Sequence, residues 1–267
     1  MNLDGKRVLL TGAAGDLGRE LSQALAAKGA RLGLMGRTDA SVASLDYLVN
    51  TQAMDAIVIQ ADVTDSTARH MAVHRMTLAY GGVDVLVNLA GVLDDHLFSE
   101  SDAAMISRLL RVNVEAPMEM VREVLSSMIA RGSGHIVNIG SLFGSIGYPG
   151  FAAYSASKFA LRGFSQALRR ELSDTGIVVT YVSLRGVRTL PGLSAAQTMA
   201  AKGAMQMDDA PRVAAHIVRA IEQQRDESYL GLPESIFARI NAVMPGLVDR
   251  ALRKLPLHRA RLARGQT

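Results

Sequence analysis

Residues 6–18 read KRVLLTGAAGDLG, a short apolar run that stops at a glycine-rich turn. Beyond the turn, Leu21 and Leu25 recur with the spacing of a helix. The stretch therefore predicts a strand, a turn and a helix. The small turn residues would let the backbone approach a pyrophosphate, whose charge the N–H groups and positive dipole end of the helix would meet. Because a glycine-rich turn alone is a weak signal, the rest of the chain decides its meaning.

Five more apolar runs follow the first, and helical stretches separate them. Strands that alternate with helices at this spacing predict a parallel sheet covered on both faces, with ligands at the carboxyl ends of the strands. We therefore expect a single Rossmann-like, doubly wound α/β fold. The expected strands are residues 6–10, 31–35, 56–59, 83–88, 135–140 and 177–182, and two long helices are expected at residues 101–128 and 153–173.

The second expected strand ends at Gly36-Arg37-Thr38, where a dinucleotide-binding fold meets the adenosine ribose. No carboxylate stands there to accept a hydrogen bond from the ribose 2′-hydroxyl. Arg37 could instead pair with a 2′-phosphate, which favours NADP(H) over NAD(H). The alternative is that Arg37 is a solvated loop charge.

A hydroxyl, a phenol and an ammonium come together in the second half of the chain. Ser141 follows the fifth expected strand, and Tyr154 and Lys158 lie one turn apart on the helix that comes next. Residues at i and i+4 share a helix face, so the phenol and the ammonium can point to the same spot. Asn113 lies inside the preceding helix, where an asparagine is more often a local hydrogen-bond device than a catalytic group.

The composition fits one folded domain. The chain has 267 residues, of which 49% are hydrophobic and 20% charged, and this suits one α/β domain over residues 1–235 with a C-terminal extension, 236–267, that is not a separate domain. It has no cysteine, which excludes disulfides and thiolate sites and suits a reducing compartment. No run of about 18 apolar residues occurs, and no secretory signal is evident. We expect a cytoplasmic protein.

Positive charge is concentrated in the C-terminal extension. Residues 239–267 hold seven Lys/Arg against one acid, Asp249, so they carry +6 of a net charge of +4 and the remainder sums to −2. A nucleic-acid binder would be expected to spread such charge over its folded core, so we predict no nucleic-acid partner. Apolar stripes accompany the basic residues. The segment could lie on an anionic membrane surface, or pack on its own domain or a second subunit.

Two further segments are candidates for a substrate loop or a metal site. Residues 190–210 carry three methionines and no periodicity, so they form either a substrate loop closing over an apolar substrate or a surface loop without a specific role. His70 and His74 form the one i, i+4 histidine pair, and no third ligand stands nearby at zinc spacing. We predict no metal site.

With these residues in view, the chain resembles a classical short-chain dehydrogenase/reductase over residues 6–221. Several motifs fall in the order that this family uses. They are the glycine turn, Asp62-Val63, Asn88-Leu89-Ala90-Gly91, Asn113, Ser141, Tyr154 with Lys158, and Thr189.

The resemblance implies hydride transfer between a nicotinamide and a carbonyl or alcohol carbon. Tyr154 would donate or accept the proton, and Lys158 would lower the phenol's pKa and hold the nicotinamide ribose. Ser141 would hydrogen-bond the substrate oxygen, and Asn113 would hold a water on the proton relay. The implied cofactor-binding residues are Gly12, Gly15, Asp16, Leu17, Gly18, Arg37, Asp62, Val63, Asn88, Ala90, Gly91, Tyr154, Lys158, Val187 and Thr189. Family members are commonly homodimers or homotetramers.

The chain departs from the family pattern at three places. Asp16 replaces a usual glycine near the phosphates, and we expect its side chain to point away. Leu89 replaces an asparagine, which is a mild change. Leu184-Arg185 replaces a Pro-Gly pair after the sixth strand, so Arg185 or Arg188 could meet an anionic substrate or the cofactor phosphate.

The sequence therefore predicts an NADP(H)-dependent reductase of hydrophobic ketones or aldehydes, or the reverse dehydrogenase of secondary alcohols. The alternative is a protein that binds NADP(H) without turnover, as a sensor or scaffold that its tail could hold at a membrane. A complete set of Asn113, Ser141, Tyr154 and Lys158 favours the enzyme, because a binding module has no need of an activated phenol.

Overall fold

A computed structural model describes residues 1–188 and 207–252 of the chain. Seven parallel strands form the central sheet, in the order β3-β2-β1-β4-β5-β6-β9. The order reverses between β1 and β4, which is the switch point where an open α/β sheet binds its ligand. The strands are β1 (Arg7–Thr11), β2 (Arg31–Gly36), β3 (Ala56–Gln60), β4 (Val85–Asn88), β5 (Gly134–Ser141), β6 (Ile177–Leu184) and β9 (Glu227–Tyr229).

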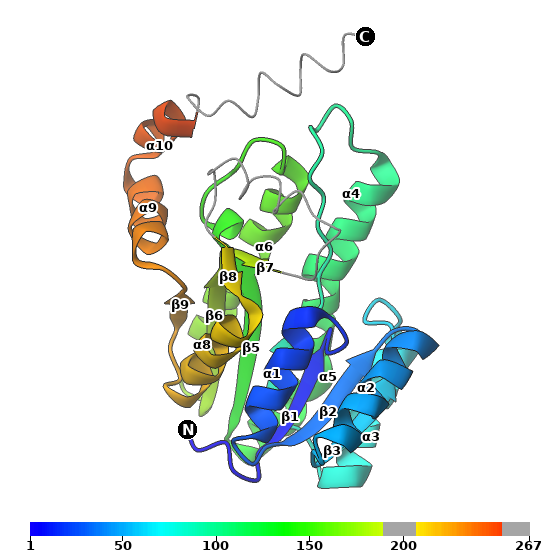
Figure 1. The fold of residues 1–267 in the computed structure, drawn as a ribbon. Helices are drawn as coiled ribbons and strands as arrows, with labels where there is room; N and C mark the ends of the chain where they lie inside the picture. Colours follow the sequence, from blue (N-terminus) through cyan, green and yellow to red (C-terminus); the bar gives the residue numbers. More distant parts are fainter. Residues whose placement is uncertain (189–206, 253–267) are drawn as a thin grey trace.

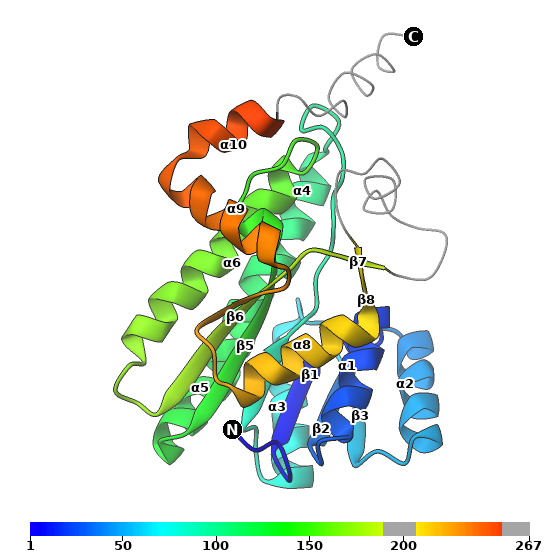
Figure 2. The same ribbon diagram turned by 60° about the vertical axis from the view of Figure 1, so that its left-hand side comes forward.

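Helices cover both faces of the sheet, as Figures 1 and 2 show. On β1, Val8 and Leu10 point into one buried cluster and Leu9 into the other, because successive side chains of a strand alternate between faces. The first cluster lies under α1 (Asp16–Ala26), α2 (Asp39–Thr51) and α8 (Ala210–Glu222), and the second under α3 (Ser66–Tyr80), α5 (Ala116–Arg131) and α6 (Ala152–Glu171). The predicted doubly wound α/β fold is confirmed.

Six of the seven strands lie where the apolar runs predicted them, and the seventh was missed. β9 is three residues long, Glu-Ser-Tyr, and lacks an apolar run to reveal it. A second sheet was also missed, in which β7 (Gly186–Arg188) pairs in parallel with β8 (Met207–Asp209). Residues 207–210 of the expected substrate loop therefore belong to β8 and the start of α8. Residues 189–206, with Thr189, lie outside the described residues.

The helix expected at residues 101–128 is three consecutive segments. α4 (Ala103–Leu110) passes into a π-helical turn (Arg111–Glu115) and then into α5. Such a turn holds one extra residue per ring and often occurs at functional sites. Asn113 lies within it and is fully buried. The turn thus directs the Asn113 amide into the interior.

The C-terminal extension begins inside the fold. α9 (Leu232–Val243) and α10 (Pro245–Leu252) follow β9, so the expected boundary between residues 235 and 236 falls within a helix. Asn241 of α9 donates from Nδ2 to the Ser145 carbonyl oxygen at 2.8 Å, which ties the extension to the loop after β5. Among the described residues, no helix combines the length and apolar character needed to cross a bilayer.

His135 makes the stability of the fold depend on pH. It is fully buried on β5, with Nε2 2.8 Å from Thr180 Oγ1, and burial lowers its pKa to about 4. In the unfolded chain the His135 imidazole has a pKa of about 6.5, so it binds a proton as the pH falls from about 6.5 to 4. The buried imidazole of the folded chain stays neutral over that range. We expect about 3 kcal/mol of the free energy of unfolding to be lost over that range.

Urea unfolding at about pH 7 and pH 4.5 measures this loss. His135→Gln should remove most of it, whereas His74→Gln, at an exposed position on α3, should leave it unchanged. An equal loss in both variants would show that His135 is not its source.

Candidate active site

A cleft of about 550 Å³ opens at the carboxyl ends of the central strands. Its size lies in the range of small-molecule sites. Ten of the residues predicted to bind a cofactor line it together, although they come from distant parts of the chain. They are Gly12, Gly15, Asp16, Leu17, Gly18, Arg37, Asp62, Val63, Ala90 and Gly91.

The glycine turn is packed closely enough to require glycine at two positions. Gly12 has φ +70°, and a Cβ there would come within 2.8 Å of the Ala90 backbone. A Cβ on Gly18 would lie 2.3 Å from the carbonyl oxygen of Gly12. No side chain caps the start of α1, so the first N–H groups of the helix can bind an anion in the cleft. These features fit a dinucleotide pyrophosphate.

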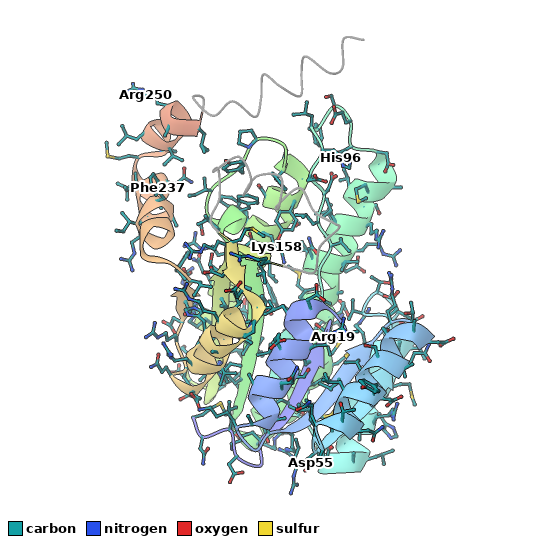
Figure 3. All side chains as sticks on the ribbon, in the orientation of Figure 1. Arg19, Asp55, His96, Lys158, Phe237 and Arg250 are labelled. Atoms are coloured by element: carbon teal, nitrogen blue, oxygen red, sulfur yellow. The ribbon has the colours of Figure 1, made fainter. Side chains whose placement is uncertain are left out.

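Asp16 is among the residues that line the cleft, and the expectation that its side chain points away from the phosphates stays a prediction. Its carboxylate lies 3.6 Å from the guanidinium of Arg19, one turn along α1, and Arg19 is labelled in Figure 3. Arg19 in turn donates to Ser44 Oγ at 3.2 Å. The ion pair offsets part of the negative charge that Asp16 brings near the phosphate position.

The far end of the cleft is rich in groups that bind anions. Arg37 is exposed, and Thr38 and Ser41 form a reciprocal cap at the start of α2. Burial alone would raise the pKa of Asp62, but hydrogen bonds from Thr64 and the charges of Arg37 and Arg111 outweigh it and hold that pKa below its usual range. Asp62 therefore stays ionised while Arg37 remains beside it.

Ser141, Tyr154 and Lys158 meet at the end of β5. Ser141 ends the strand and caps the short helix Leu142–Gly144, where its Oγ accepts from the Phe143 amide at 3.2 Å. Its side chain also lies close enough to the Tyr154 hydroxyl to act on the pKa of that phenol. Lys158 Nζ lies 5.8 Å from the centre of the Tyr154 ring and donates to the Ile139 carbonyl at 3.2 Å. The i, i+4 spacing thus places the phenol and the ammonium side by side.

Burial dominates the protonation of this group. It raises the pKa of Tyr154 to about 12, against a lowering by the Ser141 hydrogen bond, and it lowers the pKa of Lys158 to about 8. The rings of Phe143 and Phe151 lie 6.2 and 6.5 Å from that of Tyr154 and make its surroundings apolar. In the protein alone, burial therefore outweighs any lowering of the phenol's pKa by Lys158, because the loss of hydration opposes the charged form of both groups.

The Asn113 amide is fully engaged with the protein. Its Nδ2 donates to the Val92 carbonyl at 2.9 Å and to Ser157 Oγ at 3.0 Å, and its Oδ1 accepts from the Val92 amide at 2.9 Å. It therefore fastens the loop after β4 to α6, beside Lys158. A side chain with these partners is a positioning device for the site.

Four of the described residues that were predicted to bind the cofactor do not line the cleft: Tyr154 and Lys158 of the reaction centre, Asn88 and Val187. Asn88 is buried, and its Nδ2 donates to Asn138 Oδ1 at 2.9 Å. Val187 packs on the hydrophobic cluster beneath α1 and α8. Asn88 ends β4 and Val187 lies within β7, and the side chains of both serve the scaffold.

The arginines expected to meet an anionic ligand are paired with acids of β8. Arg185 is buried and donates from Nη2 to Asp208 Oδ1 at 2.8 Å, while Arg188 lies 3.4 Å from Asp209. These ion pairs join the two strands of the small sheet. The buried pairing with Asp208 argues against an anionic ligand at Arg185, whereas the side chain of Arg188 is 62% exposed and a role for it stays a prediction.

Several residues of the site were missed in the sequence. Thr38, Ser41 and Arg108 line the cleft, and Tyr181 of β6 bonds the backbone of Ser141 through its hydroxyl at 3.3 Å. The capping pattern of Thr38 and Ser41 was a signal that could have revealed the first two. Arg108 and Tyr181 had no comparable signal, since their positions depend on how helix and strand pack.

Comparisons with known proteins agree with this geometry. The family model for short chain dehydrogenases matches residues 6–199. Ketoacyl reductase HetN of Nostoc sp. is 32% identical over 257 residues, 94% of this chain and 89% of that protein. The 3-oxoacyl-(acyl-carrier-protein) reductase FabG of Escherichia coli is 32% identical over 184 residues, 68% of this chain and 74% of that protein. A short-chain dehydrogenase structure from Streptomyces avermitilis aligns with a TM-score of 0.78 and 29% identity, covering 99% of this chain and 100% of that chain.

Proposed function

The chain belongs to the short-chain dehydrogenase family and is an NAD(P)-dependent oxidoreductase acting on CH–OH or C=O groups, and from this premise we propose that it uses NADPH to reduce hydrophobic ketones or aldehydes. One observation carries the proposal. The Tyr154 phenol faces the Ser141 side chain and lies beside the buried Lys158, next to a cleft that fits a dinucleotide. A proton donor, a hydroxyl and a cation thus share one spot.

The bound nicotinamide supplies the hydride. Ser141 donates a hydrogen bond to the substrate oxygen as negative charge develops there, and Tyr154 delivers the proton that completes the alcohol. Because its pKa is about 12, the phenol is protonated at neutral pH and ready to donate. The reverse oxidation needs the phenolate, so the ligand-free site favours reduction at neutral pH.

Lys158 and Asn113 support that step. The Lys158 ammonium, with a pKa of about 8, is mostly charged at neutral pH and stabilises the phenolate that remains after proton transfer. It is also the residue proposed to hold the nicotinamide ribose. Asn113 keeps the loop after β4 in place against α6, and it is proposed to support a water on the proton path.

The cofactor preference rests on Arg37. No carboxylate stands at positions 36–38 to accept from a ribose 2′-hydroxyl, and Arg37 with the start of α2 offers a cation and N–H donors to a 2′-phosphate. We therefore propose NADP(H) over NAD(H). The other proposed cofactor contacts are Gly12, Gly15, Asp16, Leu17, Gly18, Asp62, Val63, Asn88, Ala90, Gly91, Val187 and Thr189.

The substrate class follows from the surroundings of Tyr154. Phe143, Tyr148 and Phe151 form an aromatic cluster with it, and Phe143 stacks on Tyr148 at 5.0 Å. Such a wall favours an apolar carbonyl compound. Two similar proteins are named as a ketoacyl reductase and a 3-oxoacyl-(acyl-carrier-protein) reductase, which supports reduction of a ketone on an acyl chain.

We further propose that the protein forms a homodimer or homotetramer.

A panel of ketones assayed with NADPH tests the proposal. We expect turnover to rise with the apolar length of the ketone and to stay level around neutral pH, whereas oxidation of the product alcohol should gain about tenfold per pH unit below the phenol pKa. NADPH absorbance measures both directions. A panel that is bound but never reduced, or oxidation that is fastest at low pH, would contradict the proposal.

A further inference from the structure

One face of α9 and α10 is apolar and has no cover. Six of the fourteen large apolar side chains exposed in the described part of the chain fall within twelve consecutive residues. Those of α9 recur at helical spacing and therefore share one face of that helix, and the apolar side chains continue through Met244 into the start of α10. This apolar stripe consists of Ile236, Phe237, Ile240, Val243, Met244 and Leu247.

The stripe is not the face that joins these helices to the rest of the protein. Ala238 and Val248 are buried, and Asn241 donates to the Ser145 carbonyl. These positions lie on the inward side. Val243, by contrast, is 79% exposed. The two helices therefore have an apolar face left over after packing, and an uncovered stripe of this kind marks an interaction site.

Among the described side chains, two arginines and one acid, Asp249, are exposed on the same helices as the stripe. Arg239 and Arg250 are exposed on α9 and α10, and Figure 3 labels Arg250 together with Phe237. The sequence that follows α10, residues 253–267, contains five Lys/Arg and no acid. Apolar side chains flanked by cations have the chemistry of a helix that lies in the headgroup region of an anionic bilayer.

We propose that the α9–α10 face docks on an anionic lipid surface. A second copy of the chain fits less well, because pairing the same face would bring its own arginines together. The rest of the chain carries a net −2, so the attraction is confined to this end. Docking fixes the orientation of the enzyme on the membrane.

The orientation has a consequence for the substrate, which rests on the proposed function. α9 and α10 stand at the end of the molecule to which the carboxyl ends of the strands point, as Figures 1 and 2 show. Asn241 holds α9 on Ser145, four residues after Ser141. A docked enzyme therefore has its reaction centre next to the lipid, where an apolar carbonyl compound is concentrated.

Vesicle sedimentation with the full chain tests the docking. We expect retention by vesicles of equal phosphatidylglycerol and phosphatidylcholine and little by phosphatidylcholine alone. Val243→Asp should weaken retention at least about tenfold by placing a charge in the apolar face, and Arg250→Glu more than about fivefold. Leu78→Asp and Arg75→Glu are the matched controls, because both positions are exposed on α3, and they should bind like the unaltered chain.

Three results would overturn the docking surface. One is equal retention by both kinds of vesicle, and another is a Val243→Asp variant that binds no more weakly than Leu78→Asp. The third is an unaltered chain that binds no vesicles and sediments as a dimer, with a Val243→Asp variant that sediments as a monomer. That result would assign the face to a second copy of the chain. The assay needs no substrate, and NADPH-dependent reduction of the ketone panel by the same samples shows separately whether the proposed function stands.

Discussion

Replacing Tyr154 by phenylalanine is expected to lower turnover of a ketone roughly 10³-fold, the order by which a positioned acid usually accelerates a reaction. The change removes the hydroxyl that faces the Ser141 side chain and is proposed to deliver the proton. The ring and its aromatic contacts remain. NADPH affinity, measured by fluorescence titration, should therefore change less than about twofold, because the substitution leaves the packing intact.

Tyr148→Phe is the matched control. Tyr148 belongs to the same aromatic cluster, but its buried hydroxyl has no hydrogen-bond partner, so losing it should leave turnover within a few-fold of the unaltered enzyme. Full activity in Tyr154→Phe would end the mechanism proposed here. Equal losses in both variants would point to disrupted packing of the cluster.

Reversing the charge of Arg37 is expected to invert the cofactor preference. Arg37→Glu removes a charge-assisted pair with a 2′-phosphate, which contributes about 1.5–3 kcal/mol, and adds repulsion. NADPH binding should weaken by more than about 100-fold, since each 1.4 kcal/mol is a factor of ten. The new carboxylate can accept from the 2′-hydroxyl of NADH, so NADH binding should improve.

Titration of both cofactors against both proteins measures the inversion. Arg75→Glu makes the same charge change on an exposed part of α3 and should alter neither affinity. If the unaltered enzyme prefers NADH, or if Arg37→Glu weakens NADPH and NADH equally, Arg37 is a solvated charge and the cofactor proposal fails.

Much of the fold could be predicted because its signals are local. The runs that became β1 to β6 are apolar and follow one another at the spacing of strand–helix units, so periodicity alone located them. The pairing of Tyr154 with Lys158 also needed only helix geometry. β9 escaped because it has three residues and no apolar run, and it forms by adding to the edge of a sheet that already exists.

What the sequence left out depends on burial and on distant partners. Arg185 was expected to be available to an anionic ligand, but the fold places Asp208, which is 23 residues away in the sequence, beside its guanidinium. The pKa of Tyr154 was expected to fall with a cation nearby, but burial raises it. The free energy of removing charges from water depends on all of the surrounding atoms, and no motif records it. The π-helical turn at Asn113 could not be predicted either, because its sequence pattern is that of an ordinary α-helix.

The most direct test of the account follows the hydride itself. A single turnover with NADPH deuterated at the reactive C4 position and an apolar ketone should place deuterium on the carbinol carbon of the product, as mass spectrometry would show. The same deuterium should be absent from the product of Tyr154→Phe on that timescale. Tight binding of NADPH by the unaltered enzyme, with no deuterium transferred to any ketone of the panel, would contradict the account and favour a protein that binds the cofactor without turnover.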